Sequence, residues 1–131
     1  MNIRIAACSC GQLQATVQGE PIKVSICHCF ACQRRTGSVF GAQARFAQTQ
    51  VSVVGTATEF VRVGDAGSHG RFRFCPSCGA TVYYTVDERP GFVIVPVGAF
   101  AEPSFPKPTF SVYEERMHNW VGLPTNIEHM A

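Results

Sequence analysis

The sequence is poor in charge, and its few charges nearly cancel. Only 15% of the 131 residues are charged, and 11 basic residues stand against 9 acidic ones, which leaves a formal net charge of +2. So small a balance supplies no strong field for capturing polyanions, and we expect no nucleic-acid partner. The sequence also lacks any run of about 18 apolar residues, which argues against a membrane span.

The apolar content fits one compact domain. Hydrophobic residues make up 46% of the chain, and 10 of them are phenylalanine, a composition that excludes disorder. A chain of this length fills one core but not two and contains no repeat or linker, so residues 1–131 are expected to form a single domain. The stretch between Arg4 and Cys8 is too short for the apolar segment of a secretory signal, and a cytoplasmic location is expected.

Short segments of alternating apolar and polar residues recur along the chain, whereas no helical pattern persists for three turns. This predicts a mainly β protein with little helix. Leu13, Ala15 and Val17 mark the buried face of one strand, and Ile22, Val24 and Ile26 mark that of the next. Further strands are expected at residues 40–46, 51–54, 58–63, 71–74, 80–86 and 92–97, with a long hairpin tip at residues 64–70 and a meander at the end.

Two segments near the C-terminus are expected to differ from the strands. Residues 102–108 contain Pro103, Pro106 and Pro108, which exclude a helix or a central strand, so this segment is predicted to cross the surface. Residues 114–121 are expected to make two helical turns.

Seven cysteines are the unusual feature of the composition, because an odd number cannot pair fully into internal disulfides. They fall into three clusters, each with the spacing of metal ligands, which makes zinc the leading explanation. The clusters are Cys8 and Cys10; Cys27, Cys29 and Cys32; and Cys75 and Cys78.

The sequence Cys75-Pro76-Ser77-Cys78-Gly79 has the form of a zinc knuckle, in which a tight turn points two thiolates at one ion. The glycine lets backbone N–H groups approach the sulfur atoms. Two ligands do not complete a tetrahedron, so two more thiolates must come from elsewhere in the chain. Local spacing does not decide which cluster supplies them.

If Cys8 and Cys10 join the knuckle, a closed four-thiolate site results and the three-cysteine cluster remains separate. Three thiolates leave one position open for a water or an incoming thiol. On an extended strand His28 points away from Cys27 and Cys29, so His28 is not expected to fill that position. An open zinc ion holds a substrate thiolate at neutral pH, as thiol chemistry requires. The other interpretation is a single structural zinc with three spare thiols.

Residues 27–38, CHCFACQRRTGS, resemble the signature of the glutathione-dependent formaldehyde-activating enzyme family, which centromere protein V also shares. Residues 8–11, CSCG, are similar to the opening CxCG of that family, and residues 74–80, FCPSCGA, are similar to its later CPxCG segment. The motifs occur in the family's order, and the resemblance spans about residues 5–100.

The resemblance implies a β-tent fold of antiparallel sheets and two zinc ions per chain. A structural ion is implied at Cys8, Cys10, Cys75 and Cys78, and a second, more easily lost ion at Cys27, Cys29 and Cys32. The implied activity is that of a carbon–sulfur lyase, read in reverse as joining formaldehyde to the thiol of glutathione to give S-(hydroxymethyl)glutathione. The cysteines of the second site are then the catalytic residues, and glutathione or a related small thiol is the partner.

Glutathione carries two carboxylates, so its site is expected to present cations or backbone N–H groups. Arg34 and Arg35 follow the second cluster and are predicted to bind a substrate carboxylate, the alternative being a solvated basic pair. Trp120 is interpreted as a core residue and His69 as a solvated turn residue. The candidates for proton transfer are His28, His69, His118 and Tyr113.

Two other functions compete with the lyase. A non-catalytic zinc-stabilised binding module would need the second cluster only for folding and would present a contiguous exposed patch. Redox sensing by the CxxC pair Cys29 and Cys32 is less favoured, because redox motifs of this kind open a helix beside a βαβ unit and the sequence predicts no such unit.

Overall fold

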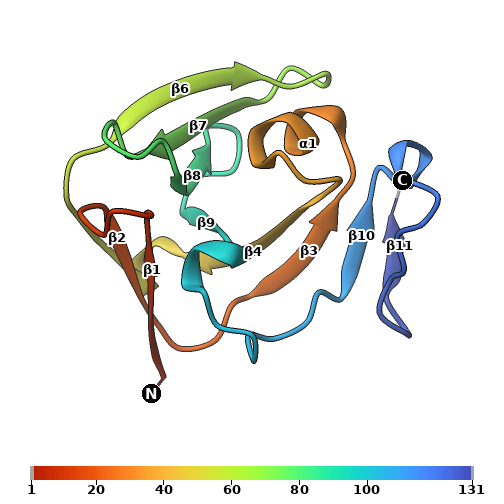
Figure 1. Ribbon diagram of the computed structural model, residues 1–131, viewed down its shortest axis with the longest axis horizontal. Coiled ribbons are helices and arrows are strands. Elements are labelled where there is room, and N and C mark those ends of the chain that lie inside the picture. The colour runs from red at the N-terminus through yellow and green to blue at the C-terminus, as the bar shows by residue number, and fades with distance from the viewer. Residues whose placement is uncertain (1, 131) are drawn as a thin grey trace.

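Two β-sheets form the framework of the computed structural model, which describes residues 2–130 (Figure 1). The smaller sheet has the order β1–β2–β5 and is antiparallel throughout. Its strands are Ile3–Ala7 (β1), Gln14–Gln18 (β2) and Val51–Val54 (β5). The prediction of a mainly β protein is confirmed, although β1 was not expected as a strand.

The larger sheet has the order β11–β10–β3–β4–β9–β8–β7–β6. Its pairings are antiparallel except at one edge, where β10 runs parallel to both β3 and β11. Its strands are Lys23–Cys27 (β3), Gly41–Ala47 (β4), Thr58–Val63 (β6), His69–Phe74 (β7), Thr81–Val86 (β8), Phe92–Pro96 (β9), Phe110–Val112 (β10) and Glu128–Met130 (β11).

The predicted hairpin and meander form one run of neighbouring strands. β6 pairs with β7 with Phe60 opposite Phe72, and β8 and β9 extend the sheet in chain order. The tip is shorter than expected, because His69 and Gly70 already belong to β7. His69 is therefore a strand residue rather than a turn residue, and its Nδ1 bonds a carboxylate oxygen of Glu88 at 2.8 Å.

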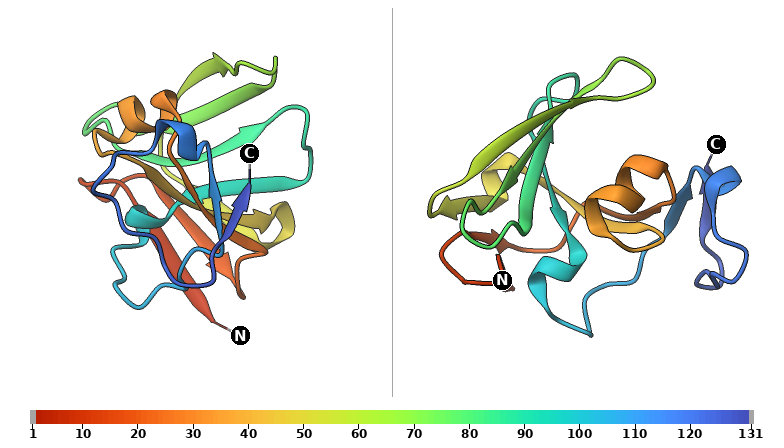
Figure 2. Two further views of the ribbon diagram at one scale, coloured as in Figure 1. Left: turned by 90° about the vertical axis from the view of Figure 1, so that its right-hand side faces the viewer. Right: turned by 45° about the horizontal axis from the view of Figure 1, so that its top comes forward.

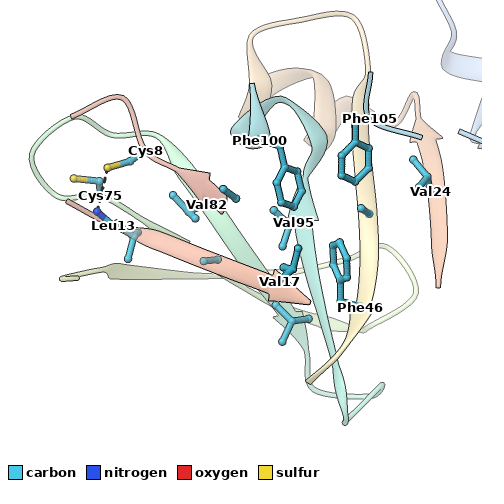
Figure 3. Close-up of a cluster of buried hydrophobic side chains, with 14 residues drawn as sticks. Cys8, Leu13, Val17, Val24, Phe46, Cys75, Val82, Val95, Phe100 and Phe105 are labelled. Carbon is cyan, nitrogen blue, oxygen red and sulfur yellow. Dashed lines mark hydrogen bonds between the residues drawn. The ribbon is translucent and has the colours of Figure 1, made fainter. Parts of the chain in front are cut away.

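The core lies between the two sheets (Figure 3). Leu13, Ala15 and Val17 are fully buried, as the alternation predicts, and face Phe46 and Val95 of the larger sheet in the same cluster. Val24 and Ile26 are buried as expected, but Ile22 precedes β3 and is 55% exposed, so its predicted place on the buried face was wrong. Ile22 lies one residue before β3, so the alternation that buries Val24 and Ile26 does not extend to its side chain.

A short α-helix, Phe30–Thr36 (α1), lies on the concave side of the larger sheet, between the β6–β7 hairpin and the strands β10 and β11 (Figures 1 and 2). Cys29 caps its first turn, with its Sγ accepting the N–H of Cys32 at 3.3 Å, and Gly37 ends it at φ 71°. Within residues 2–130, no helix has the length and apolar character needed to cross a membrane.

The remaining helical elements are short 3-10 turns. Residues 102–108 have no regular structure, as the prolines predict, although Phe105 is buried against Phe100 with ring centroids 4.8 Å apart. The expected two helical turns at residues 114–121 were wrong, because only Glu114–Arg116 (η3) is helical. The Arg116 carbonyl accepts a hydrogen bond from the side chain of Gln33 on α1 at 3.1 Å. This carbonyl is therefore bonded to α1 instead of to a further turn of its own helix. The other 3-10 turns are Gln48–Gln50 (η1) and Val97–Phe100 (η2).

Candidate metal centres and adjoining cavity

The first cluster consists of four cysteines that come together at one end of the smaller sheet: Cys8 and Cys10 from the β1–β2 turn, and Cys75 and Cys78 from the β7–β8 turn. The sulfur atoms of Cys8, Cys10, Cys75 and Cys78 all lie within 4.8 Å of one another. Cys10 Sγ is 3.6 Å from both Cys8 Sγ and Cys75 Sγ. A tetrahedral zinc ion with Zn–S bonds of about 2.3 Å has sulfur–sulfur edges of about 3.8 Å, so the donor set fits zinc in number, type and spacing.

Tight turns hold these sulfur atoms. Gly79 adopts a left-handed φ of 80°, which a residue with a Cβ rarely adopts, and its N–H donates to the Cys75 carbonyl at 2.8 Å. The N–H of Ser77 donates to Cys75 Sγ at 3.4 Å, and that of Leu13 donates to Cys8 Sγ at 3.3 Å. The backbone donor at Cys75 favours the thiolate of this residue over the thiol and helps to lower its pKa.

Gln12 supports the first cluster and was missed by sequence reasoning. Its Nε2 donates to Cys75 Sγ at 3.0 Å and, chiefly through this bond, lowers the pKa of the Cys75 thiol to about 6. The same amide bonds the backbone of Thr56, donating to its carbonyl at 2.7 Å and accepting from its N–H at 2.8 Å. Gln12 therefore ties the cluster to the chain beyond β5. Its position between CSCG and β2 carries no signal of this role.

The second cluster lies where β3 meets α1. Cys27 ends β3, Cys29 caps α1, and Cys32 lies in its first turn. All three are buried, and their sulfur atoms lie within 4.8 Å of one another. No His, Asp or Glu within residues 2–130 joins them.

His28 lies between two of these cysteines but faces the opposite way. It is fully buried, and its Nε2 is 3.0 Å from Ser111 Oγ on β10. Burial lowers the pKa of its imidazole and favours the neutral ring. The expectation that His28 does not complete the second cluster is confirmed.

The thiols of the second cluster differ in how readily they ionise. Hydrogen bonds with Cys27 and Cys32 lower the pKa of Cys29, whereas the hydrogen bond with Cys29 raises the pKa of Cys27. One thiolate therefore suppresses ionisation of its neighbours. A bound cation allows all three to ionise, which is the state in which cysteine binds zinc.

A cavity of about 520 Å³ opens beside Cys32, between α1 and the strands β6, β7 and β8. This volume is within the range of small-molecule sites, about 300 to 1,000 Å³. Both predicted substrate residues, Arg34 and Arg35, line it. Sequence reasoning missed the opposite wall, which includes Phe60, Arg62 and Phe72. Alternation places Phe60 and Arg62 on one face of β6, but it does not show that this face meets α1.

Gly41 makes room for buried polar groups near Cys32. A methyl group replacing its hydrogen would lie 3.2 Å from Arg35 Nη2, 3.3 Å from Gln43 Oε1 and 3.4 Å from Cys32 Cβ. Arg35 Nη2 and Gln43 Oε1 are both buried, and neither has a hydrogen-bond partner within residues 2–130. A free donor and a free acceptor thus lie next to Cys32.

The other candidates for proton transfer do not line the cavity. His118 Nε2 lies 3.1 Å from Gln33 Oε1, on the α1 face that meets the C-terminal segment. Tyr113 has a left-handed φ of 58° before η3. Trp120 is 74% exposed, so its interpretation as a core residue was wrong. Its indole makes an edge contact with the ring of His118.

These features define a small β protein with two thiol clusters, each able to hold a metal ion. The model of the glutathione-dependent formaldehyde-activating enzyme family matches residues 3–116, and the chain belongs to this family. A crystal structure of a Rhodobacter sphaeroides protein is similar in fold, with 20% identity, coverage of 72% of this chain and 85% of that one, and a TM-score of 0.56. No curated protein matches the chain.

Proposed function

We propose that this protein is a zinc-dependent carbon–sulfur lyase that forms and cleaves the adduct of formaldehyde with glutathione or a related thiol. The supporting observation is the second cluster: three thiols without a fourth donor within residues 2–130, next to a cavity lined by arginines. The first cluster, with four thiols, then holds the structural ion. A cytoplasmic location belongs to this proposal, because free thiols persist in a reducing compartment.

Zinc fits the second cluster because thiolates are its preferred soft ligands and three of them leave a position for substrate. When bound there, the ion supplies a Lewis acid that keeps a substrate thiol ionised at neutral pH. The chain's own residues then bind the rest of the substrate and stabilise the charge that the reaction moves.

Three arginines around the cavity suit a dianionic thiol. Arg34, Arg35 and Arg62 line it, and none forms an ion pair with another residue of the described chain. A guanidinium binds a carboxylate through two parallel hydrogen bonds. Arg34 and Arg62 are assigned to the carboxylates of glutathione.

Arg35 is assigned to the reacting oxygen, because this residue lines the cavity beside Cys32 and its Nη2 has no hydrogen-bond partner within the described residues. The substrate sulfur forms a bond to the carbonyl carbon, and the π electrons move to oxygen, which then takes up a proton. A donor already in place for the negative oxygen lowers the barrier, and holding thiol and aldehyde together removes most of the entropic cost. The reverse reaction returns the proton and expels the thiolate.

The test is exchange NMR of glutathione and formaldehyde with protein whose zinc content has been measured. We expect two zinc ions per chain and faster interconversion of free and adduct forms than in buffer. Cys29→Ser protein is the matched control and should show the buffer rate. No acceleration by protein carrying both ions would exclude this substrate and favour the zinc-stabilised binding module.

A further inference from the structure

One wall of the cavity is more apolar than glutathione and formaldehyde require. Phe60, Phe72 and Phe74 all line it. The hydroxymethyl group is small and polar, and the rest of glutathione consists mainly of amides and charged groups. Phenyl rings offer none of these groups a hydrogen bond, and burying an amide without one is unfavourable. The aromatic wall therefore calls for an apolar part of the ligand.

Neighbouring side chains hold Phe72, the part of the aromatic wall nearest the middle of the sheet, in place. The ring of Phe72 stacks on Tyr84 with centroids 4.5 Å apart and an angle of 28° between the planes. The guanidinium carbons of Arg35 and Arg62 lie 5.6 and 5.8 Å from the Phe72 centroid. Cationic and aromatic surfaces are thus adjacent, which suits an anion that also carries an aromatic group.

Phe60 is the exposed part of this aromatic wall. It lies on β6, the edge strand of the larger sheet, and is 59% exposed although it borders the cavity. An apolar ligand group seated against Phe60 would cover this ring, and removing the exposed surfaces of the ring and the ligand group from water would favour binding.

We propose that the preferred substrates are thiol adducts of aldehydes that carry an aromatic ring, with the ring against Phe60 and Phe72. This inference rests on the proposed function and keeps its chemistry. Sulfur bonds to the carbonyl carbon, the π pair moves to oxygen, and oxygen takes up the proton released by the thiol. Only the group on that carbon differs, and it fills the apolar part of the cavity while the arginines hold the carboxylates.

Binding of two unreactive thioethers tests the cavity apart from catalysis. Isothermal titration calorimetry compares S-benzylglutathione with S-methylglutathione on the full-length, metal-containing protein. We expect the benzyl compound to bind about tenfold more tightly or better, the surplus left after ordering costs from burying one ring. Equal affinity for the two compounds would overturn the inference.

Two variants on one strand locate the effect. Phe60→Ala should remove most of the preference for the benzyl group, measured as the ratio of the two affinities on the same protein. Val63→Ala is the matched control, because Val63 is also 59% exposed on β6 but points to the other face. It should retain the wild-type preference. A preference unaffected by Phe60→Ala would place the benzyl group elsewhere and overturn the assignment.

Exchange NMR with glutathione and either phenylacetaldehyde or formaldehyde separates this inference from the proposed function. We expect a larger acceleration over buffer with phenylacetaldehyde. Acceleration with formaldehyde alone would overturn the inference and leave the proposed function standing. No acceleration with either aldehyde would overturn the proposed function and the substrate assignment that rests on it.

Discussion

Nε2 of His28 and the hydroxyl oxygen of Ser111 lie 3.0 Å apart, across 83 positions of the sequence. Both side chains are fully buried. Ser111 belongs to β10, whose parallel pairing with β3 places it opposite Ile26. The bond therefore fastens the turn that carries two cysteines of the second cluster to the larger sheet, on the side away from the cavity.

We expect Ser111→Ala to destabilise the protein by about 1 to 3 kcal/mol, because a buried imidazole nitrogen loses its partner. Urea unfolding of zinc-loaded protein measures the change. Ser52→Ala, at an exposed position on β5, is the control and should change stability by less than about 0.5 kcal/mol. Equal stability of the two variants would mean that the His28 contact contributes nothing.

Glu114 should add a pH-dependent contribution to stability. Hydrogen bonds from Ser111 and His129 lower its pKa in the folded protein. The lowered pKa adds stability above the ordinary value of about 4.3, and this stability is lost as pH falls through the folded-state pKa. Wild-type protein should therefore lose more unfolding free energy than Glu114→Gln between pH 7 and pH 3. Parallel curves for the two proteins would contradict the shift.

Replacing Cys75 tests the structural ion. Cys75 is fully buried and contacts both Cys10 and Gln12, so Cys75→Ser should give insoluble or molten protein that lacks the first zinc ion. A structural zinc site contributes about 10 to 16 kcal/mol, comparable to the whole net stability of a domain. Zinc analysis and near-UV circular dichroism report the loss. A well-folded variant with an unchanged melting temperature would refute a structural role.

Cys29→Ser should separate folding from activity at the second cluster. Cys29 caps α1 by accepting the N–H of Cys32, and serine is among the best residues at this helix position. The helix cap therefore survives the change while the thiolate is lost. We expect a melting temperature close to wild type, one zinc ion instead of two, and adduct exchange at the buffer rate. Collapse of this variant would move Cys29 into the structural set.

Arg35→Met should reduce kcat/KM for adduct cleavage by about 10- to 100-fold, the value of one charged hydrogen bond of about 1.5 to 3 kcal/mol. Arg89→Met, at an exposed position outside the cavity, is the control and should act like wild type. Steady-state rates at matched zinc content provide the measurement. If Arg35→Met raised KM alone, Arg35 would bind the ground state rather than the developing oxygen charge.

Local patterns predicted most strands and the knuckle, because alternation and cysteine spacing are properties of neighbouring residues. Leu13 and Val17 are buried as predicted, and the motif resemblance paired Cys8 and Cys10 with the knuckle, a pairing that the structure brings together. Helix α1 escaped prediction because its 7 residues are too few for a helical period to appear.

Features that depend on distant contacts could not be predicted from local patterns. The burial of Trp120 was predicted from its size, but the segment that carries it docks through the bond between His118 and Gln33 and leaves the indole outside. The cavity is likewise formed by faces of α1 and β6 that meet only in the folded chain, so Arg34 was a candidate while Arg62 was not.

The two clusters differ in how much chain must close to assemble them. Cys10 and Cys75 meet across 65 positions, whereas Cys29 and Cys32 are 3 positions apart. Short loops close at a smaller entropic cost, so a nascent polypeptide presents a competent thiol trio before its ends have met. If both clusters bind zinc as proposed, we expect the second cluster to capture metal first during refolding and the four-thiol cluster to be loaded last.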